Sequence, residues 1–225
     1  MAERIQIYID GGNFYHLVLK KLKIQESDFN FDQFVRFLAG ERLFSNGGKR
    51  YYTGTVREQM DDPKSKESMS RQTQLFTSLK KSGWEIKTSK LRKRLEEVTV
   101  DRRMIGHEKL LSLGLKKIQF ERWREKGIDV KIATDLIAGA VDNKYDTAIV
   151  VSSDGDLVPA IDWVRKRCGK RVEYVGFSIL DSTDTDRSTK PLLTMISRTD
   201  RQRVITEEEI KAFVAGATSL FAEVA

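Results

Sequence analysis

The stretch Ile5-Gln6-Ile7-Tyr8-Ile9-Asp10-Gly11-Gly12-Asn13 is typical of a buried strand that ends in an acid and a glycine turn. A second stretch, Thr147-Ala148-Ile149-Val150-Val151-Ser152-Ser153-Asp154-Gly155-Asp156, ends in two further acids. Apolar runs of this kind are typical of parallel strands that are covered on both faces. Helical spacing of apolar residues follows each run. This alternation predicts an α/β fold with a mostly parallel central sheet.

The segments around these two runs alternate in the same way. Besides residues 4–9 and 147–152, the expected strands are residues 49–56, 84–88 and 171–177. The expected helices are residues 13–22, 31–43, 64–82, 129–142 and 157–167. Residues 178–190 are polar and predict a loop near the site, and Thr206 predicts the cap of a last helix.

No internal repeat or low-complexity linker divides the chain. We therefore expect residues 1–225 to form a single domain, with a basic insertion at about residues 86–126 and a C-terminal extension at about residues 178–225. Within the insertion, residues 94–100 and 117–123 are candidates for two paired strands. A partly mobile arm is the alternative for the same segment.

Composition narrows the class of protein. Cys168 is the only cysteine, which excludes a disulfide within the chain and a structural zinc site of the cysteine-rich type. The N-terminus lacks the pattern of a secretory signal, and no apolar run approaches the roughly 20 residues that span a bilayer. We expect a soluble protein located in the cytoplasm, with no membrane partner. The sequence leaves the oligomeric state open, a homodimer included.

Positive charge is concentrated in one part of the chain. The formal net charge is +7, and residues 86–126 alone hold 13 Lys or Arg against 6 Asp or Glu, an excess of the same size. A concentrated basic surface is the footprint of a nucleic-acid-binding protein. A solvated face with internal salt bridges is the alternative, at about even odds on charge alone.

Acidic residues follow the predicted strands and open one predicted helix. The carboxyl ends of parallel strands meet at one edge of a sheet, so Asp10, Asp154 and Asp156 are expected to converge. Asp129 begins the helix expected after the basic segment. Carboxylates gathered there would repel one another unless a cation lay among them, and oxygen-only sites suit Mg²⁺ or Mn²⁺. This pattern favours cleavage of phosphoester bonds.

Each acid also has a structural interpretation. Asp10, Asp129 and Asp156 are each good caps for the helix that follows. Asp135 lies six residues after Asp129, about 240° around the helix, so the two do not share one face. We therefore expect Asp129 to be a metal ligand and Asp135 to position water or other ligands. Neither His16 nor His107 lies in a triad-like setting, which disfavours nucleophilic catalysis.

Three blocks of sequence together resemble one family. The blocks are Tyr8-Ile9-Asp10-Gly11-Gly12-Asn13, Lys126-Gly127-Ile128-Asp129-Val130 followed by Asp135, and Ser152-Ser153-Asp154-Gly155-Asp156-Leu157-Val158-Pro159. The chain is similar to the NYN domain family over about residues 4–177, and within it to the LabA-like group. The resemblance implies a three-layer Rossmannoid, PIN-like fold and a metal-dependent ribonuclease.

The resemblance also implies residue roles. Asp10, Asp129, Asp154 and Asp156 match the metal-binding acids, Asn13 the polar partner of the first, and Asp135 the helix acid. Two positions depart from the family pattern: Ser153 stands where Gly is usual, and Leu157 where Phe is common. Neither departure removes a carboxylate.

The main hypothesis is hydrolysis of RNA, most simply single-stranded RNA, by a Mg²⁺ or Mn²⁺ site. The groups expected to contact RNA are Ser152, Ser153, Arg92, Lys93, Arg94, Arg102, Arg103 and Lys126. Tyr15 or Trp123 is a candidate for stacking on a base, with core packing as the alternative for Trp123. A non-catalytic RNA- or protein-binding module is the second hypothesis. A small-molecule phosphatase is the third, and Gly12 counts against it because such enzymes often carry a second acid there.

Overall fold

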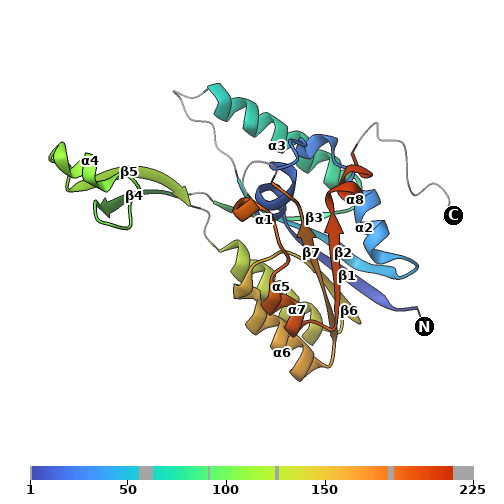
Figure 1. Cartoon of the computed structure of the whole chain (residues 1–225). Helices are drawn as coiled ribbons and strands as arrows, with labels where there is room; N and C mark the ends of the chain where they lie inside the picture. Colours follow the sequence, from blue (N-terminus) through green and yellow to red (C-terminus); the bar gives the residue numbers. More distant parts are fainter. Residues whose placement is uncertain (1, 56–62, 91, 125–126, 182–184, 215–225) are drawn as a thin grey trace.

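The structure is a computed structural model that describes residues 2–55, 63–90, 92–124, 127–181 and 185–214. Its centre is a six-stranded sheet of order β3-β2-β1-β6-β7-β8 (Figure 1). These strands are β1 (Arg4–Asp10), β2 (Leu43–Thr55), β3 (Glu85–Lys90), β6 (Thr147–Val151), β7 (Arg171–Ser178) and β8 (Arg201–Thr206). Each strand is parallel to its neighbours. The predicted α/β fold with a parallel sheet is confirmed.

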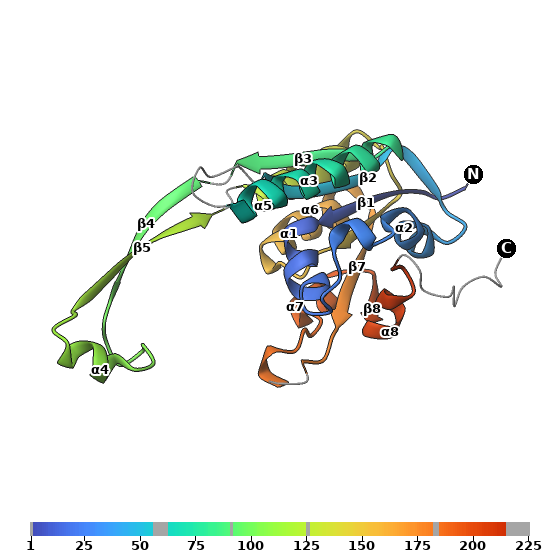
Figure 2. The same cartoon turned by 90° about the horizontal axis from the view of Figure 1, so that it is seen from above.

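Helices cover both faces of the sheet and make three layers (Figures 1 and 2). One face is packed by α1 (Gly11–Phe14), the π-helical turn Tyr15–Leu19, α2 (Phe31–Ala39), α3 (Pro63–Lys81) and α8 (Glu207–Lys211). The other face is packed by α5 (Ile128–Val141), α6 (Val158–Cys168) and α7 (Leu193–Arg198). No helix in the described ranges is long and apolar enough to cross a membrane.

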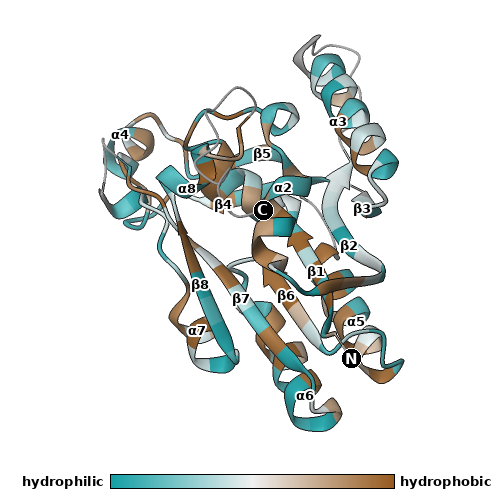
Figure 3. Cartoon of the chain, turned by 90° about the vertical axis from the view of Figure 1, so that its right-hand side faces the viewer, coloured by the Kyte–Doolittle hydropathy of each residue, from teal (hydrophilic) through white to brown (hydrophobic). Residues whose placement is uncertain are grey.

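The middle strand β1 shows why the sequence folds this way. Ile5, Ile7 and Ile9 are fully buried in the core of the α2 face, and Tyr8 between them is fully buried in the core of the α5 face. Side chains of a strand alternate between the two faces of a sheet, so an uninterrupted apolar run satisfies both cores at once. Figure 3 shows the same concentration of hydrophobic residues on the central strands.

Three predicted elements differ from the structure in their bounds or helix type. The helix expected over residues 31–43 ends at Ala39, because Gly40 adopts a φ of 60° that an L side chain rarely adopts. β2 then begins at Leu43, six residues before the expected strand, and the N–H of Leu43 donates to the carbonyl of Glu3. The helix expected over residues 13–22 is a short α-helix followed by a π-helical turn.

The segment expected as an extension contributes to the sheet. Its strand β8 pairs with β7, and Ile205, Ile210 and Phe213 around it are buried in the core of the α2 face. We did not predict this strand, because its first three residues are polar or charged. Edge strands tolerate such residues. The predicted cap of the following helix is confirmed: Thr206 and Glu209 form a reciprocal capping box.

The basic segment forms an arm, which comprises β4 (Arg92–Thr99), α4 (His107–Ser112) and β5 (Lys117–Arg124). β4 and β5 pair antiparallel, with Val98 opposite Ile118. The predicted pairing is confirmed. Figures 1 and 2 show the arm projecting from the body, and its large apolar side chains are exposed, including Leu95, Ile105 and Phe120.

An ion pair joins the starts of β1 and β6. The guanidinium of Arg4 donates to Asp146 at 2.9 Å, and the backbone N–H of Arg4 donates to the same carboxylate at 2.9 Å. These hydrogen bonds lower the pKa of Asp146 from 3.8 to about 2. The contact therefore stabilises the fold above pH 3.8, and this contribution is lost as the pH falls through about 2.

We expect Asp146→Asn to lower the free energy of unfolding at pH 7 by up to about 1 kcal/mol, since both side chains are partly exposed. The difference from wild type should shrink as the pH falls from 4 to 2. Urea unfolding across this pH range measures it. Asp142→Asn, at an exposed pair with Lys144, is the control and should change stability little. An Asp146→Asn deficit that grows below pH 4 would contradict the expectation.

Candidate active site

The carboxyl ends of β1 and β6 lie side by side at the centre of the sheet, since Ile9 is the register partner of Val151. The chain runs outward from β1 to β2 and β3 on one side, and from β6 to β7 and β8 on the other. The strand order therefore reverses between β1 and β6. Ligands of open α/β sheets bind in the crevice at such a switch point. Asp10 ends one of these strands, and Ser152 follows the other.

Asp10 is held tightly at this point. The residue is 6% exposed, and its carboxylate accepts hydrogen bonds from the N–H of Asn13 at 3.0 Å and from the Ser152 hydroxyl at 3.2 Å. The first contact caps α1, which confirms the interpretation of Asp10 as a helix cap. The second joins the ends of two strands across the switch point. Asp10 is thus both a cap and a fixed carboxylate at the crevice.

Asn13 makes a second link across the switch point. Its side-chain oxygen accepts the backbone N–H of Ser153 at 3.0 Å. The hydroxyl of Ser153 in turn lies 2.9 Å from that of Tyr174. The predicted pairing of Asn13 with the first acid therefore extends to the loop after β6. The two loops hold a common position at the edge of the sheet.

Three further carboxyl groups lie on the β6 side of the crevice. Asp154 accepts the N–H of Asp156 at 2.9 Å and caps the short turn there. The pKa of Asp129, in the first turn of α5, is raised above 3.8, first by burial. The charge of Asp154, a hydrogen bond shared with that carboxyl, and the charge of Asp156 raise it further. Asp129, Asp154 and Asp156 therefore share one electrostatic environment.

The donor chemistry of this edge fits a hard divalent cation. All four acids offer oxygen ligands, and the mutual repulsion that raises the pKa of Asp129 is the kind a cation relieves. Within the described ranges, however, no three Asp, Glu, His or Cys side chains are grouped so that they could hold a metal ion. Asp10 is held by Asn13 and Ser152, while Asp129, Asp154 and Asp156 interact with one another through their charges.

The partners of the Asp135 carboxylate belong to β2 and β3. The hydroxyl of Tyr52 donates to its carboxylate at 2.7 Å, and Arg50 and Lys87 lie 3.5 Å and 4.0 Å from the same oxygen. Arg50 is only 7% exposed, so Asp135 supplies the countercharge that a buried guanidinium needs. Asp135 therefore joins α5 to β2 and β3. Its expected role in positioning water stays a prediction.

The described cations that were expected to contact RNA lie on the arm, and two of them are paired. Lys93 contacts Glu121, and Arg103 contacts Asp101 at 2.6 Å. Arg94 and Arg102 are exposed and have no ion-pair partner in the described part of the chain. The side chain of Arg92 and the whole of Lys126 lie outside the described residues, as does the side chain of Trp123. The arm is thus partly salt-bridged and partly available to an anion.

Sequence reasoning missed Glu26 and Tyr51. The hydroxyl of Tyr51, a fully buried residue, donates to the Glu26 carboxylate at 2.8 Å. Burial first, and then the charges of Glu26 and Asp10, raise the pKa of Tyr51. Tyr51 therefore holds the Glu26 carboxylate by a hydrogen bond and is within electrostatic reach of Asp10. Glu26 has no motif around it that could have indicated this place.

The NYN domain family matches residues 4–194. The fold is similar to the crystal structure of a protein of unknown function from Vibrio parahaemolyticus RIMD 2210633, at 21% identity and a TM-score of 0.50, covering 91% of this chain and 93% of that chain. A chitinase structure from Chromobacterium violaceum ATCC 12472 aligns at 9% identity and a TM-score of 0.27, covering 91% of this chain and 56% of its own, too weakly to support an argument. No curated protein matches the chain.

Gly11 provides a test of the packing beside Asp10. A Cβ at this position would lie 2.4 Å from the ring of Tyr51. We expect Gly11→Ala to destabilise the protein by about 1–3 kcal/mol, because a buried aromatic ring must move. Thermal unfolding measures the effect. Gly155→Ala, whose Cβ would lie an ordinary 3.6 Å from Leu192, is the control and should unfold like wild type. Equal stability of both variants would show that Tyr51 yields freely.

Proposed function

Because the chain belongs to the NYN domain family, which is generally nuclease-like and related to the PIN-like nucleases, we propose that it is a metal-dependent ribonuclease. Within the family we assign it to the LabA-like group on its sequence blocks. The observation that carries the proposal is the gathering of acids at the switch point. Asp10 is fixed there by Ser152, and Asp129 is coupled to Asp154 and Asp156.

Asp10, Asp129, Asp154 and Asp156 would hold Mg²⁺ or Mn²⁺. When bound, such an ion supplies charge neutralisation at the phosphoryl group and acidification of a bound water. The chain's own residues supply preorganisation. Ser152 and the Asn13 N–H hold the Asp10 carboxylate, and Asn13 holds the loop of Ser153 against the same edge. Groups held before the substrate arrives need no reorganisation during the reaction.

The substrate is best described as single-stranded RNA. The crevice lies at the end of a sheet, and the arm offers exposed cations at Arg94 and Arg102 to a phosphate backbone. An RNA substrate fits a cytoplasmic setting. In a homodimer, the exposed apolar residues of the arm would pack against the second copy of the chain.

A non-catalytic binding module is the second candidate. The observation that favours it is that no three ligand-type side chains in the described ranges are grouped to hold an ion. A module of this kind would bind RNA through the same surface and leave it intact. Turnover therefore separates the two candidates.

Cleavage of a labelled single-stranded RNA tests the proposal directly. We expect wild type to cut it with Mn²⁺ or Mg²⁺ and not with EDTA. Asp10→Asn and Asp154→Asn should each lower the rate by on the order of 100-fold or more, since each removes a carboxylate that would hold the ion at the reacting phosphate. Asp142→Asn, an exposed acid at the far end of α5, is the matched control and should cut at the wild-type rate.

A second readout does not depend on turnover. Mn²⁺ should raise the melting temperature of wild type, because a ligand that binds only the folded state stabilises it. The Asp129→Asn and Asp154→Asn variants should lose this shift. Intact RNA and an unchanged melting temperature in all samples, with RNA binding retained, would replace the nuclease with the binding module.

The arm makes a separate prediction about affinity. Arg94→Ala and Arg102→Ala should each weaken RNA binding and reduce the slope of log K against log salt by about 1, since each removes one phosphate contact. Arg103→Ala, whose guanidinium is paired with Asp101, is the control and should change the slope less. Titration by fluorescence anisotropy at several salt concentrations measures the slopes. Equal slopes for all variants would exclude the arm from the RNA path.

A further inference from the structure

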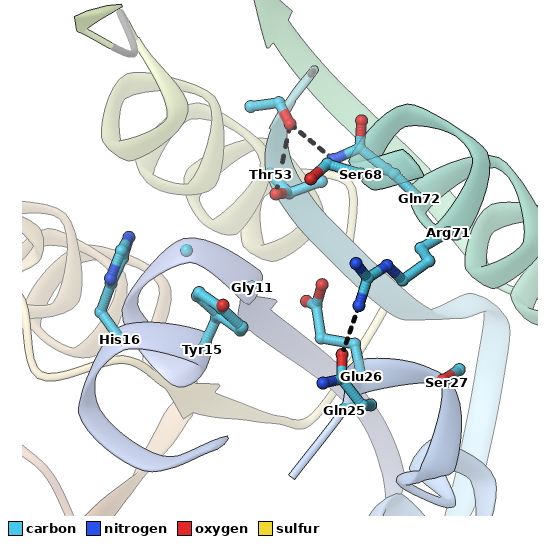
Figure 4. Close-up of a pocket in the computed structure, with 12 residues that line it drawn as sticks. Gly11, Tyr15, His16, Gln25, Glu26, Ser27, Thr53, Ser68, Arg71 and Gln72 are labelled. Carbon is cyan, nitrogen blue, oxygen red and sulfur yellow. Dashed lines mark hydrogen bonds between the residues drawn. The ribbon is translucent and has the colours of Figure 1, made fainter. Parts of the chain in front are cut away.

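A cleft of about 460 Å³ opens next to Asp10 on the α3 side of the sheet (Figure 4). Its wall includes the backbone of Gly11 and Gly12, which directly follow the acid, the end of β2, and the part of α3 around Ser68, Arg71 and Gln72. Tyr15 and His16 enter it from the π-helical turn. Insertions of this kind in a helix frequently occur at functional sites. The volume falls in the range of ligand-binding clefts.

The cleft and the acidic edge share structural parts. Gly11 packs against the ring of Tyr51, and the Tyr51 hydroxyl donates to Glu26, which lines the cleft. Figure 4 shows the Glu26 side chain pointing into the cleft between Tyr15 and Arg71. A strand of RNA whose phosphate lies at Asp10 therefore has this cleft immediately beside it.

The charges of the lining residues do not favour a phosphate. Arg71 is the cation on the α3 side, and it already contacts Glu67 at 2.8 Å and the Gln25 side chain at 3.1 Å. Glu26 places a carboxyl group against it. Burial, and then Lys20, lower the pKa of His16, so its ring is mainly neutral at pH 7. The lining thus combines a near balance of charge with hydrogen-bonding groups.

Two aromatic rings complete the lining. Tyr15 and His16 lie edge to face, with ring centroids 5.2 Å apart. Base–aromatic stacking tolerates any base, because every base has a π face. The amides, the guanidinium and the carboxyl group offer partners to the polar edge of a heterocycle. A planar, neutral and polar group suits this surface better than an anion or an aliphatic chain.

We propose that this cleft binds the base of the RNA nucleotide next to the phosphate at Asp10. Tyr15 stacks on the base, Glu26 accepts a hydrogen bond from a base N–H group, and Arg71 donates to a base or ribose oxygen. The inference rests on the proposed function for its substrate, RNA, and adds where the enzyme recognises a base.

Binding in EDTA tests the cleft without any cleavage. We would measure the affinity of wild type for a labelled ten-nucleotide RNA and for an abasic strand of the same length at low salt. Wild type should bind the RNA more tightly than the abasic strand. Tyr15→Ala should lose about fivefold or more of the RNA affinity and keep its affinity for the abasic strand, the size expected for one lost stacking contact.

Further variants guard against a simple folding defect. Tyr15→Phe keeps the ring and should bind RNA like wild type. Arg71→Ala removes exposed contacts to Glu67 and Gln25, so it should fold normally and still lose part of the base-dependent affinity. Trp163→Ala removes a partly exposed aromatic side chain on α6 and is the matched control, with affinity unchanged.

The contrary outcomes are distinct. Equal losses on both strands would make the cleft a backbone contact, and no loss in Tyr15→Ala and Arg71→Ala would remove it from the RNA path. Either result overturns the base-binding inference and leaves the ribonuclease proposal to its own cleavage assay. Failure of wild type to bind either strand would overturn both, because RNA would then not be the substrate.

Discussion

Backbone hydrogen bonds between β1 and β6 hold together two segments that lie far apart in the chain. The Asp10 and Ser152 side chains that meet at their ends are separated by 142 residues. Both strands are buried on both faces, so every polar backbone group in them must pair within the sheet. The further strands are added outward on opposite sides of this pair, β2 and β3 next to β1, and β7 and β8 next to β6. The crevice at their carboxyl ends follows directly from that pairing.

Electrostatics divides the acids of this region into two groups. Asp129, Asp154 and Asp156 interact with one another on the β6 side of the crevice: burial, and then the charges of Asp154 and Asp156, raise the pKa of Asp129. Asp135 faces Arg50, Lys87 and Tyr52, so its charge is compensated inside the fold. In the part of the chain that the structure describes, the first group has no ion pair with a cationic side chain, and a bound cation would therefore stabilise these acids most. The second group stabilises the packing of α5 on the sheet.

The arm differs from the body in what stabilises it. It is a two-stranded hairpin with a short helix at its tip, and a lone hairpin is marginal in water. Its cross-strand ion pairs, such as Lys117 with Glu97 at 2.6 Å, each contribute little because they are exposed. The apolar side chains that it exposes are not covered by the rest of the described chain.

Local patterns in the sequence determined the strands, most helices and the acids at their ends. An apolar run, a turn glycine or a capping box acts within a few residues, so β1, β6 and the Thr206 cap were predictable, whereas the pairing of β4 with β5 was one of two alternatives that the sequence left open. The sequence also predicted that Asp10 and the acids after β6 meet at one edge, because parallel topology requires it.

Only the tertiary structure decided what those residues contact. It paired Asp135 with Arg50 and Tyr52, added the polar segment of β8 to the sheet as an edge strand, and bound the Glu26 carboxylate to the hydroxyl of the buried Tyr51. None of these outcomes leaves a periodic signal, because each depends on side chains that are remote in sequence and are brought together by packing of the core.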